Sequence, residues 1–254
     1  MTINIVQLQQ SNKYLKQGVP AQYIGLWRRH LLETATSKDD SALVLWMQSQ
    51  HYHIDLRIPA ACTGFSAVKN LHEYNDMELM LLATQQGFAG ITTVSPETAQ
   101  SSSVCQWLRE IDYQTPTDAQ DIGKMLFIDA NTVIETGIDA AYLELWRRQV
   151  SAIQPCYFKQ VLGKNSIGKQ LPAYLIRIGN QVAYARPRNS VLPPAASLLD
   201  AIKQQQPNRQ TLLNWLDMEI SFGEMLDINA INNEWRIHYS TLPYKQNTIA
   251  QLFV

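Results

Sequence analysis

The sequence has no excess of charge of either sign. Its 254 residues include 21 Lys and Arg against 22 Asp and Glu, and the formal net charge is −1. Basic residues occur in runs of two at most, as in Arg28-Arg29 and Arg147-Arg148. A protein that binds nucleic acid needs a basic surface that attracts the phosphate backbone. We therefore predict no nucleic-acid partner.

Cysteine is scarce. Cys62, Cys105 and Cys156 lie far apart and form no C-x-x-C motif, so we expect free thiols in a reducing compartment. The first ten residues lack the basic and apolar segments of a signal peptide. No apolar run approaches the length that crosses a bilayer. These absences predict a cytoplasmic protein without a membrane span.

Motifs of several enzyme classes are also missing. The chain contains no G-x-S-x-G nucleophile elbow, no G-x-G-x-x-G dinucleotide loop and no G-x-x-x-x-G-K-[ST] phosphate loop. Rossmann dehydrogenases and phosphate-loop enzymes are disfavoured on this ground. Scattered Ser, His, Asp and Cys residues leave other catalytic arrangements open. We favour a non-enzymatic protein and expect no cofactor.

What the sequence does contain is a repeat. The pattern Y-x-x-L-W-R-R occurs at Tyr23–Arg29 and again at Tyr142–Arg148. A second echo joins Trp107–Thr115 to Trp235–Thr241, and a third joins Leu126-Phe127-Ile128 to the final residues Leu252-Phe253-Val254. We interpret the chain as one unit of about 125 residues built twice. The first domain is predicted to span residues 1–139, with a flexible N-terminal arm, and the second, opened by the second Trp-Arg-Arg strand, residues 140–254.

Each copy has short segments of alternating hydrophobicity and one helical interruption. The clearest alternation is at 51–58, where Tyr52, Ile54, Leu56 and Ile58 share one face and His51, His53, Asp55 and Arg57 the other. Helices are expected within 71–85 and 195–205. This pattern predicts an all-β protein with two tandem antiparallel β-barrels and short capping helices. The expected strands are 22–32, 42–47, 51–58, 87–94, 104–113, 122–128, 132–136, 142–148, 157–162, 173–178, 182–186, 219–222, 234–239 and 249–254.

A family resemblance supports the two barrels. Gly25-Leu26-Trp27 is a G-x-W on the first long strand and resembles the lipocalin opening, in which the Trp packs across the closed end of the barrel. Together with Asp55–Pro59 and the second Trp-Arg-Arg strand, the chain resembles lipocalin-like double-barrel proteins. These are typified by a fungal protein first noticed as a casein-kinase partner, with bacterial relatives of unknown role. The resemblance covers nearly the whole chain and implies tandem barrels, no established enzymatic activity and an apolar ligand. The second copy departs from it, because Glu144 stands where the first copy has Gly25.

Two histidines and a carboxylate, His51, His53 and Asp55, share one face of the strand at 51–58. Neighbouring imidazoles can share a zinc ion with a carboxylate, and an acid–base role is a further alternative. The simpler interpretation is that this face of a half-exposed strand points to solvent. We adopt it and expect no metal.

Arg109 is the most informative charged residue. It lies in a row of alternating residues that is otherwise apolar and includes Trp107 and Tyr113. A buried guanidinium needs an anion, which could be Glu135 or the head group of a ligand. With Asp55 and Arg57, which share one strand face, these residues form the predicted ligand site in the first barrel. Its members are Trp27, Asp55, Arg57, Trp107, Arg109, Tyr113 and Glu135.

The leading functional hypothesis is non-enzymatic binding of a small apolar or amphipathic molecule, including carboxylate-bearing ones, in the first barrel. A barrel of about eight strands has room for one small ligand. Because Trp235 takes the place of Arg109 in the second copy, we predict that the larger cavity lies in the first barrel. The rivals are a protein-interaction scaffold with filled barrels, and a barrel enzyme that uses Asp55, Glu135 and Arg109. The oligomeric state stays open.

Overall fold

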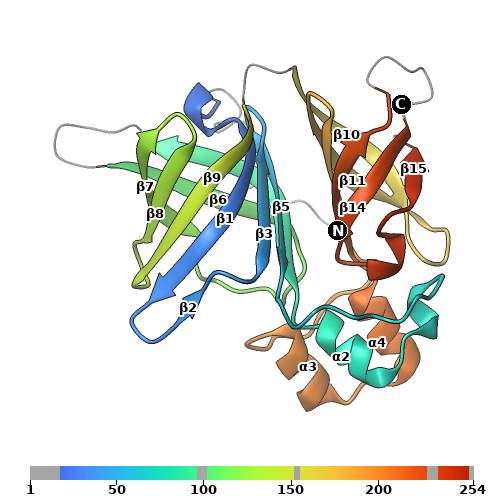
Figure 1. The fold of residues 1–254 in the computed structure, drawn as a ribbon. Helices are drawn as coiled ribbons and strands as arrows, with labels where there is room; N and C mark the ends of the chain where they lie inside the picture. The colour runs from blue at the N-terminus through green and yellow to red at the C-terminus, as the bar shows by residue number, and fades with distance from the viewer. Residues whose placement is uncertain (1–17, 96–101, 152–154, 228–233, 252–254) are drawn as a thin grey trace, which may run out of the picture.

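The computed structural model describes residues 18–95, 102–151, 155–227 and 234–251, and its larger sheet closes on itself. The nine strands follow the order β2-β1-β3-β4-β5-β6-β7-β8-β9, and β1 also pairs with β9, so that all but the short β2 form a closed antiparallel barrel (Figure 1). Expectations for residues 1–17, 96–101 and 252–254 lie outside the described residues. The strands are β1 (Gly25–Thr34), β2 (Lys38–Asp39), β3 (Leu43–Gln48), β4 (Tyr52–Ile58), β5 (Gln86–Ser95), β6 (Ser103–Asp112), β7 (Ile122–Asp129), β8 (Thr132–Gly137) and β9 (Tyr142–Ser151).

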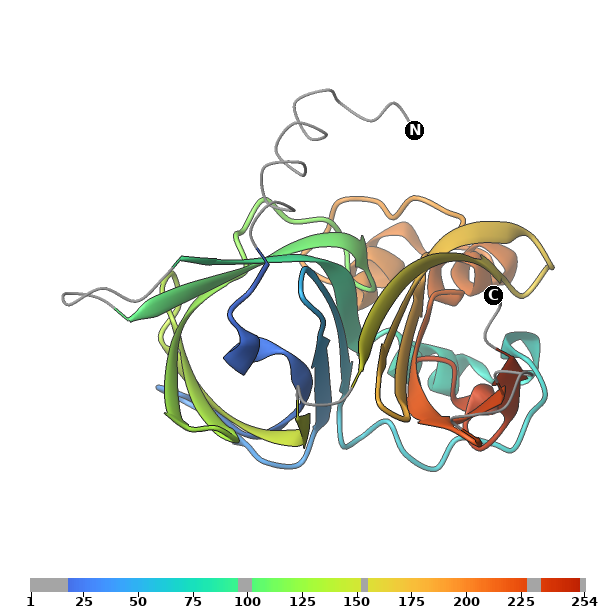
Figure 2. The ribbon, with the colours of Figure 1, turned by 90° about the horizontal axis from the view of Figure 1, so that it is seen from above.

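The second sheet has six antiparallel strands in sequence order and remains open. Within the described ranges β10 and β15 are its two edges and do not pair with each other. Seen from above, the sheet curls into a half-barrel beside the closed ring (Figure 2). The predicted all-β class is confirmed, with a half-barrel as its second member. The strands are β10 (Cys156–Lys164), β11 (Gln170–Ile178), β12 (Gln181–Arg186), β13 (Glu219–Met225), β14 (Glu234–Ser240) and β15 (Ile249–Gln251).

Short helices connect β4 to β5 in the barrel and β12 to β13 in the half-barrel. Asn75 and Glu78 form a capping box at the start of α2, and Ser197 and Asn208 cap α3 and α4 through side-chain hydrogen bonds. None of the helices in the described ranges is long and apolar enough to cross a membrane. The helical segments are η1 (Ala21–Tyr23), η2 (Leu71–Glu73), α2 (Asp76–Leu82), α3 (Leu198–Gln205), α4 (Arg209–Leu216) and η3 (Pro243–Lys245).

The two Trp-Arg-Arg strands are neighbours in one barrel, which corrects the predicted start of the second one. Trp27 on β1 lies opposite Arg148 on β9, and Arg29 lies opposite Trp146. The first barrel therefore runs through β9 to Ser151 instead of ending at residue 139. The two strands share a pattern because both line the same interior from adjacent places, and they are not equivalent strands of two copies.

The second arginine of each triplet ties this seam together. Arg29 is buried on β1 and donates hydrogen bonds of 2.8 Å to both Glu144 on β9 and Asp39. Arg148 on β9 lies 4.5 Å from the ring centroid of Trp27 and donates to backbone carbonyls ahead of β1. Charged hydrogen bonds and cation–π contacts therefore cross the β1–β9 seam in both directions.

Indole rings fill the barrel. The ring centroid of Trp46 lies 6.1 Å from that of Trp27, 5.7 Å from that of Trp107 and 5.8 Å from that of Trp146. All four side chains are at least nine-tenths buried and belong to one cluster with residues of the other strands. The Trp27–Trp46 pair is stacked and the other two are edge-to-face, and aromatic pairs of both kinds add stability beyond the area they bury.

Carboxylates share this interior with the tryptophans. Glu135 on β8 accepts a 2.7 Å hydrogen bond from the hydroxyl of Tyr142, and Glu144 accepts one from the indole nitrogen of Trp146. Burial, together with the charge of Glu144, raises the pKa of Glu135 to about 8. The Glu135 carboxyl is thus mostly protonated at neutral pH.

The barrel and the half-barrel are joined by a common core. Strand β4 is buried on both faces: His53 and Asp55 point into the barrel, while Ile54 and Leu56 pack with the half-barrel strands and the helices in the largest apolar cluster. Arg188 strengthens the junction, because its guanidinium donates to the backbone carbonyls of Asp112, Tyr113 and Trp215.

The seam can be tested with Trp146→Ala, which should lower the free energy of unfolding by about 3–5 kcal/mol, because a fully buried indole is lost from the barrel interior. Its exposed neighbour provides the control, and Arg147→Ala should change stability by less than about 0.5 kcal/mol. Denaturant unfolding followed by circular dichroism measures both. Equal effects of the two substitutions would contradict the placement of Trp146.

A second expectation concerns pH. The raised pKa means that folded Glu135 holds a proton between about pH 4.5 and 8 that the unfolded chain has released. The free energy of unfolding therefore falls as pH rises through this window. Glu135→Gln keeps an acceptor for Tyr142 but cannot ionise. Between pH 5 and 9 the free energy of unfolding of this variant should fall by roughly 3–5 kcal/mol less than that of the parent protein. Parallel stability–pH curves for the two proteins would refute the assignment.

Candidate functional site

The interior of the first barrel is too full for the ligand that the sequence predicted there. Trp27, Trp107, Asp55 and Glu135 all lie in it, as expected. The free volume among the Trp, Phe, Asp, Glu and Arg side chains at its centre is only about 10 Å³. That space holds one water molecule at most. The prediction that the larger cavity lies in the first barrel is therefore wrong.

Arg109 forms ion pairs, but its partners are not the predicted Glu135. Its guanidinium lies 2.7 Å from Asp121 and 3.0 Å from Asp112, and it is 3.7 Å above the ring centroid of Phe88. The side chain is 30% exposed, at the margin of the barrel. Glu135, the predicted partner, is bonded to Tyr142 instead. Arg109 is thus neutralised by the protein and stacked on a ring, so no ligand head group is needed there.

Two other predicted residues have structural partners as well. Arg57 donates a 2.8 Å hydrogen bond to Asp55 on the same strand. Tyr113 does not face the barrel interior at all. Its ring belongs to the core shared with the half-barrel, and its hydroxyl donates to the carbonyl of Leu82. The seven predicted residues therefore do not come together around one cavity.

The histidine-bearing face of β4 points inward, which corrects the expectation of a solvent face. His53 is fully buried, with Nδ1 2.9 Å from the Thr92 hydroxyl, which donates to Gln48. Burial and the charge of Arg109 lower the pKa of His53 to about 3, so the ring is neutral. In the described part of the chain no group of three His, Cys, Asp or Glu side chains is placed to hold a metal ion.

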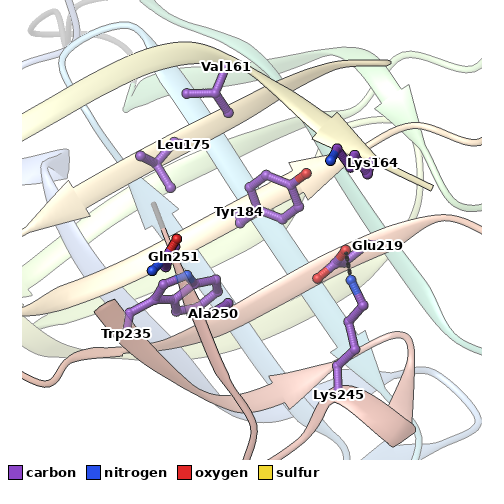
Figure 3. Close-up of a pocket in the computed structure, with 9 residues that line it drawn as sticks. All are labelled: Val161, Lys164, Leu175, Tyr184, Glu219, Trp235, Lys245, Ala250 and Gln251. Carbon is purple, nitrogen blue, oxygen red and sulfur yellow. Dashed lines mark hydrogen bonds and ion pairs between the residues drawn. The ribbon is translucent and has the colours of Figure 1, made fainter. Parts of the chain in front are cut away.

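A larger pocket lies on the concave face of the half-barrel. Its volume is about 200 Å³. Figure 3 shows apolar side chains gathered at one end, from β10, β11, β14 and β15, and polar side chains at the other. The apolar end is formed by Val161, Leu175, Trp235 and Ala250, with Gln251 beside them; the polar end consists of Lys164, Tyr184, Glu219 and Lys245.

A shared β-bulge shows how this pocket relates to the first barrel. The pairing of β5 with β6 shifts register between Ala89 and Gly90, and the pairing of β13 with β14 shifts between Phe222 and Gly223. At both glycines a Cβ atom would lie within 2 Å of a carbonyl oxygen of the facing strand, so only glycine fits. The bulges identify β5 and β6 as the counterparts of β13 and β14.

The registers then match the two sheets residue by residue. On β6, Trp107 pairs with the β5 residue that lies two places after Gly90. On β14, Trp235 pairs with the β13 residue that lies two places after Gly223. The two tryptophans are therefore equivalent. Two places before the same glycines, Phe88 on β5 corresponds to Ser221 on β13. The duplication inferred from the sequence is therefore present in this pair of strands, and Trp235 corresponds to Trp107 instead of Arg109.

Continuing across the sheets explains why one is filled and the other is not. Phe88 faces Asp55, which faces Trp46; in the half-barrel Ser221 faces Tyr184, which faces Leu175. Leu175 thus stands where the barrel has Trp46, and Ser221 where it has Phe88. Strand β9, which carries Trp146, has no counterpart among the described strands of the half-barrel. The pocket occupies the space that aromatic rings fill in the first barrel.

The polar end of the pocket is held by fixed contacts. Glu219 accepts a 2.6 Å hydrogen bond from Lys245 on one oxygen and a 3.0 Å bond from the hydroxyl of Ser221 on the other. Behind it, buried Arg186 pairs with Asp217 at 2.7 Å. These pairs leave the carboxylate of Glu219 neutralised and its position fixed.

Two donors at this end have no partner among the residues that the structure describes. Within the described residues, neither the ammonium group of Lys164 nor the hydroxyl of Tyr184 takes part in a hydrogen bond or ion pair. Burial and the charge of Glu219 raise the pKa of Tyr184, so its hydroxyl stays protonated and can donate. Gly163 makes room for this hydroxyl, since a Cβ atom there would lie 1.7 Å from it.

Sequence patterns alone provide little indication of these pocket residues. Lys164, Tyr184 and Lys245 occur in ordinary amphipathic or loop segments, and Trp235 was interpreted as bulk that fills the second barrel. The one available signal was the repeat itself, aligned on the two bulge glycines: it replaces Trp46 by Leu175 and Phe88 by Ser221, a loss of aromatic volume at two facing positions.

Comparisons with known proteins place the chain in a family. No curated protein sequence matches it. Among solved structures, it is similar to the crystal structure of the uncharacterized protein YLR301w from Saccharomyces cerevisiae, with a TM-score of 0.49 and 11% sequence identity, over 85% of this chain and 84% of that one. The model of the family described as Protein HRI1 matches residues 26–180, from β1 to the turn after β11. This match spans more than half of the sequence, and the chain belongs to the HRI1 family.

Proposed function

We propose that the protein binds a small amphipathic molecule in the concave pocket of the half-barrel, without chemical conversion. The observation that carries the proposal is the division of this 200 Å³ pocket into an apolar end around Trp235 and a polar end with two donors that have no partner in the described part of the chain. Binding pockets combine apolar walls with a few placed polar groups in this way. The sequence predicted such a ligand in the first barrel. Because the free volume there is only about 10 Å³, we propose the half-barrel pocket as the binding site instead.

The pocket offers groups for binding and fewer for catalysis. Its carboxylate, Glu219, is occupied by Lys245 and Ser221 and is thus unsuited to act as a base. The acidic residues of the alternative enzyme hypothesis, Asp55 and Glu135, are enclosed in the first barrel with room for one water molecule. These contacts favour reversible binding over the enzyme hypothesis.

The test is a titration followed by NMR on the six indole N–H groups, with Trp235 assigned through Trp235→Phe. The probes are octanoate and 2-naphthoate, which join an apolar body to a carboxylate. The Trp235 resonance should shift with added probe, while those of Trp27 and Trp46 in the filled barrel stay in place as internal controls. A shift confined to the first-barrel tryptophans, or no shift with either probe, would overturn the proposal.

A second proposal is that the open edge of the half-barrel binds a protein. Strand β10 pairs only with β11, and in the described part of the chain its other edge has no partner strand. Tyr157 and Leu162 on this strand are 59% and 54% exposed. An unpaired edge with exposed apolar side chains can accept an added strand. The sequence resemblance to a fungal casein-kinase partner suggests a casein kinase as the protein to test.

For this second proposal, binding of a purified casein kinase to the full-length protein can be measured by biolayer interferometry. Replacing both exposed residues, as Tyr157→Lys with Leu162→Lys, should weaken binding by about tenfold or more, because the edge becomes charged. Exchanging the exposed Met77 on α2 for Lys serves as a matched control and should have no effect. Unchanged binding by the edge variant, or no binding by the parent protein, would exclude the proposal.

A further inference from the structure

We propose that the half-barrel pocket selects a planar aromatic anion of one or two fused rings. This inference rests on the proposed function of the same pocket and specifies its ligand class. Three independent features support it. They are the comparison of the half-barrel with the aromatic positions of the first barrel, the volume of the pocket, and the charge at its polar end.

The first barrel shows what completes this architecture. There Trp107 makes an edge-to-face contact with Trp46, at a centroid distance of 5.7 Å and an angle of 78°. Its equivalent, Trp235, shares the pocket lining with Leu175 instead of a second tryptophan. It has no aromatic partner in the described part of the chain. A flat ring in the pocket would occupy the space of the missing indole and restore the pair. The comparison with the first barrel thus predicts a ligand with an aromatic ring beside Trp235.

The volume sets the size of that ring. An apolar cavity of about 150 Å³ accommodates benzene, and this pocket measures about 200 Å³. One ring or two fused rings fit, whereas a larger fused system does not. Val161, Leu175 and Ala250 present alkyl surfaces around Trp235, which suits a flat apolar body.

The polar end sets the sign of the charge. Lys164 has no carboxylate within 4 Å in the described ranges, and the hydroxyl of Tyr184 beside it has no acceptor. Glu219, the carboxylate of the lining, is already paired with Lys245 at 2.6 Å. The uncompensated charge of the pocket is therefore positive. An anion gains a cation and a hydroxyl donor there, while a cationic ligand meets only an occupied carboxylate.

An alkyl-chain carboxylate is the main competitor, since it would use the same two donors. It would leave Trp235 without a ring partner and would therefore lack the added stabilisation of an aromatic pair. The structure therefore favours the aromatic anion over the aliphatic one by up to about tenfold in affinity. This difference is large enough to measure.

The experiment compares three probes on the intact protein by calorimetry and by the Trp235 indole resonance: 2-naphthoate, octanoate and the cation 2-naphthylmethylammonium. Naphthoate should bind more tightly than octanoate, by up to about tenfold, and the cation should not bind. If octanoate binds as tightly as naphthoate or the cation binds, the ligand class is wrong while the proposed pocket stands. If no probe shifts Trp235, both proposals fail.

Two variants locate the effect. Leu175→Trp restores the residue of the filled barrel and should abolish naphthoate binding, whereas Leu162→Trp on the exposed part of β10 should not. Lys164→Met, at an exposed position that leaves the fold intact, should weaken naphthoate binding by about tenfold and leave binding of uncharged 2-naphthalenemethanol unchanged. Naphthoate binding that survives both Leu175→Trp and Lys164→Met would overturn the assignment.

Discussion

Closure of the first sheet between β1 and β9 is the constraint on which the rest of the structure depends. A sheet that curls must either pair its two edges or leave them exposed, and closure removes both edges at once. Here the pairing is reinforced from inside by Trp27 and Trp146, and across the seam by Arg29 and Arg148. Inside the closed ring the packed tryptophans and their neighbours leave a free volume of about 10 Å³ among them.

The half-barrel shows the same architecture without that constraint. It keeps the bulge at Gly223 and the tryptophan that follows from it, yet it has no described strand that would bring its edges together. The positions that hold Trp46 and Phe88 in the barrel carry Leu175 and Ser221 instead. Loss of closure and loss of aromatic volume thus occur together, and their joint result is a pocket with apolar walls beside donors that have no partner among the described residues.

Local patterns could be predicted from the sequence, and their spatial relations could not. The alternation of β4 and the helices expected within 71–85 and 195–205 depend on residues close in the chain, and the structure has these elements. Alternation does not say whether the polar face of a strand meets water or a closed interior lined with ion pairs. His53 and Asp55 therefore looked like solvent-facing residues and proved to be buried.

The repeat was misassigned for a related physical reason. Similar strands arise both when a unit is duplicated and when two strands line the same interior as neighbours. The Trp-Arg-Arg strands belong to the second case, and Trp107 with Trp235 to the first. Only the register of the sheets separates the two, because it depends on hydrogen bonds between residues far apart in the sequence. The candidate pocket depends on that register, so the repeat alone did not locate it.

Burial of β4 on both faces has a consequence for how the molecule holds together. One strand serves as the inner lining of the barrel and as the apolar floor on which the half-barrel rests. Separating the two sheets would expose Ile54, Leu56 and their half-barrel partners to water at the same time. The two sheets are therefore halves of one cooperative folding unit, and the open sheet can stay open because its neighbour acts as its missing second layer.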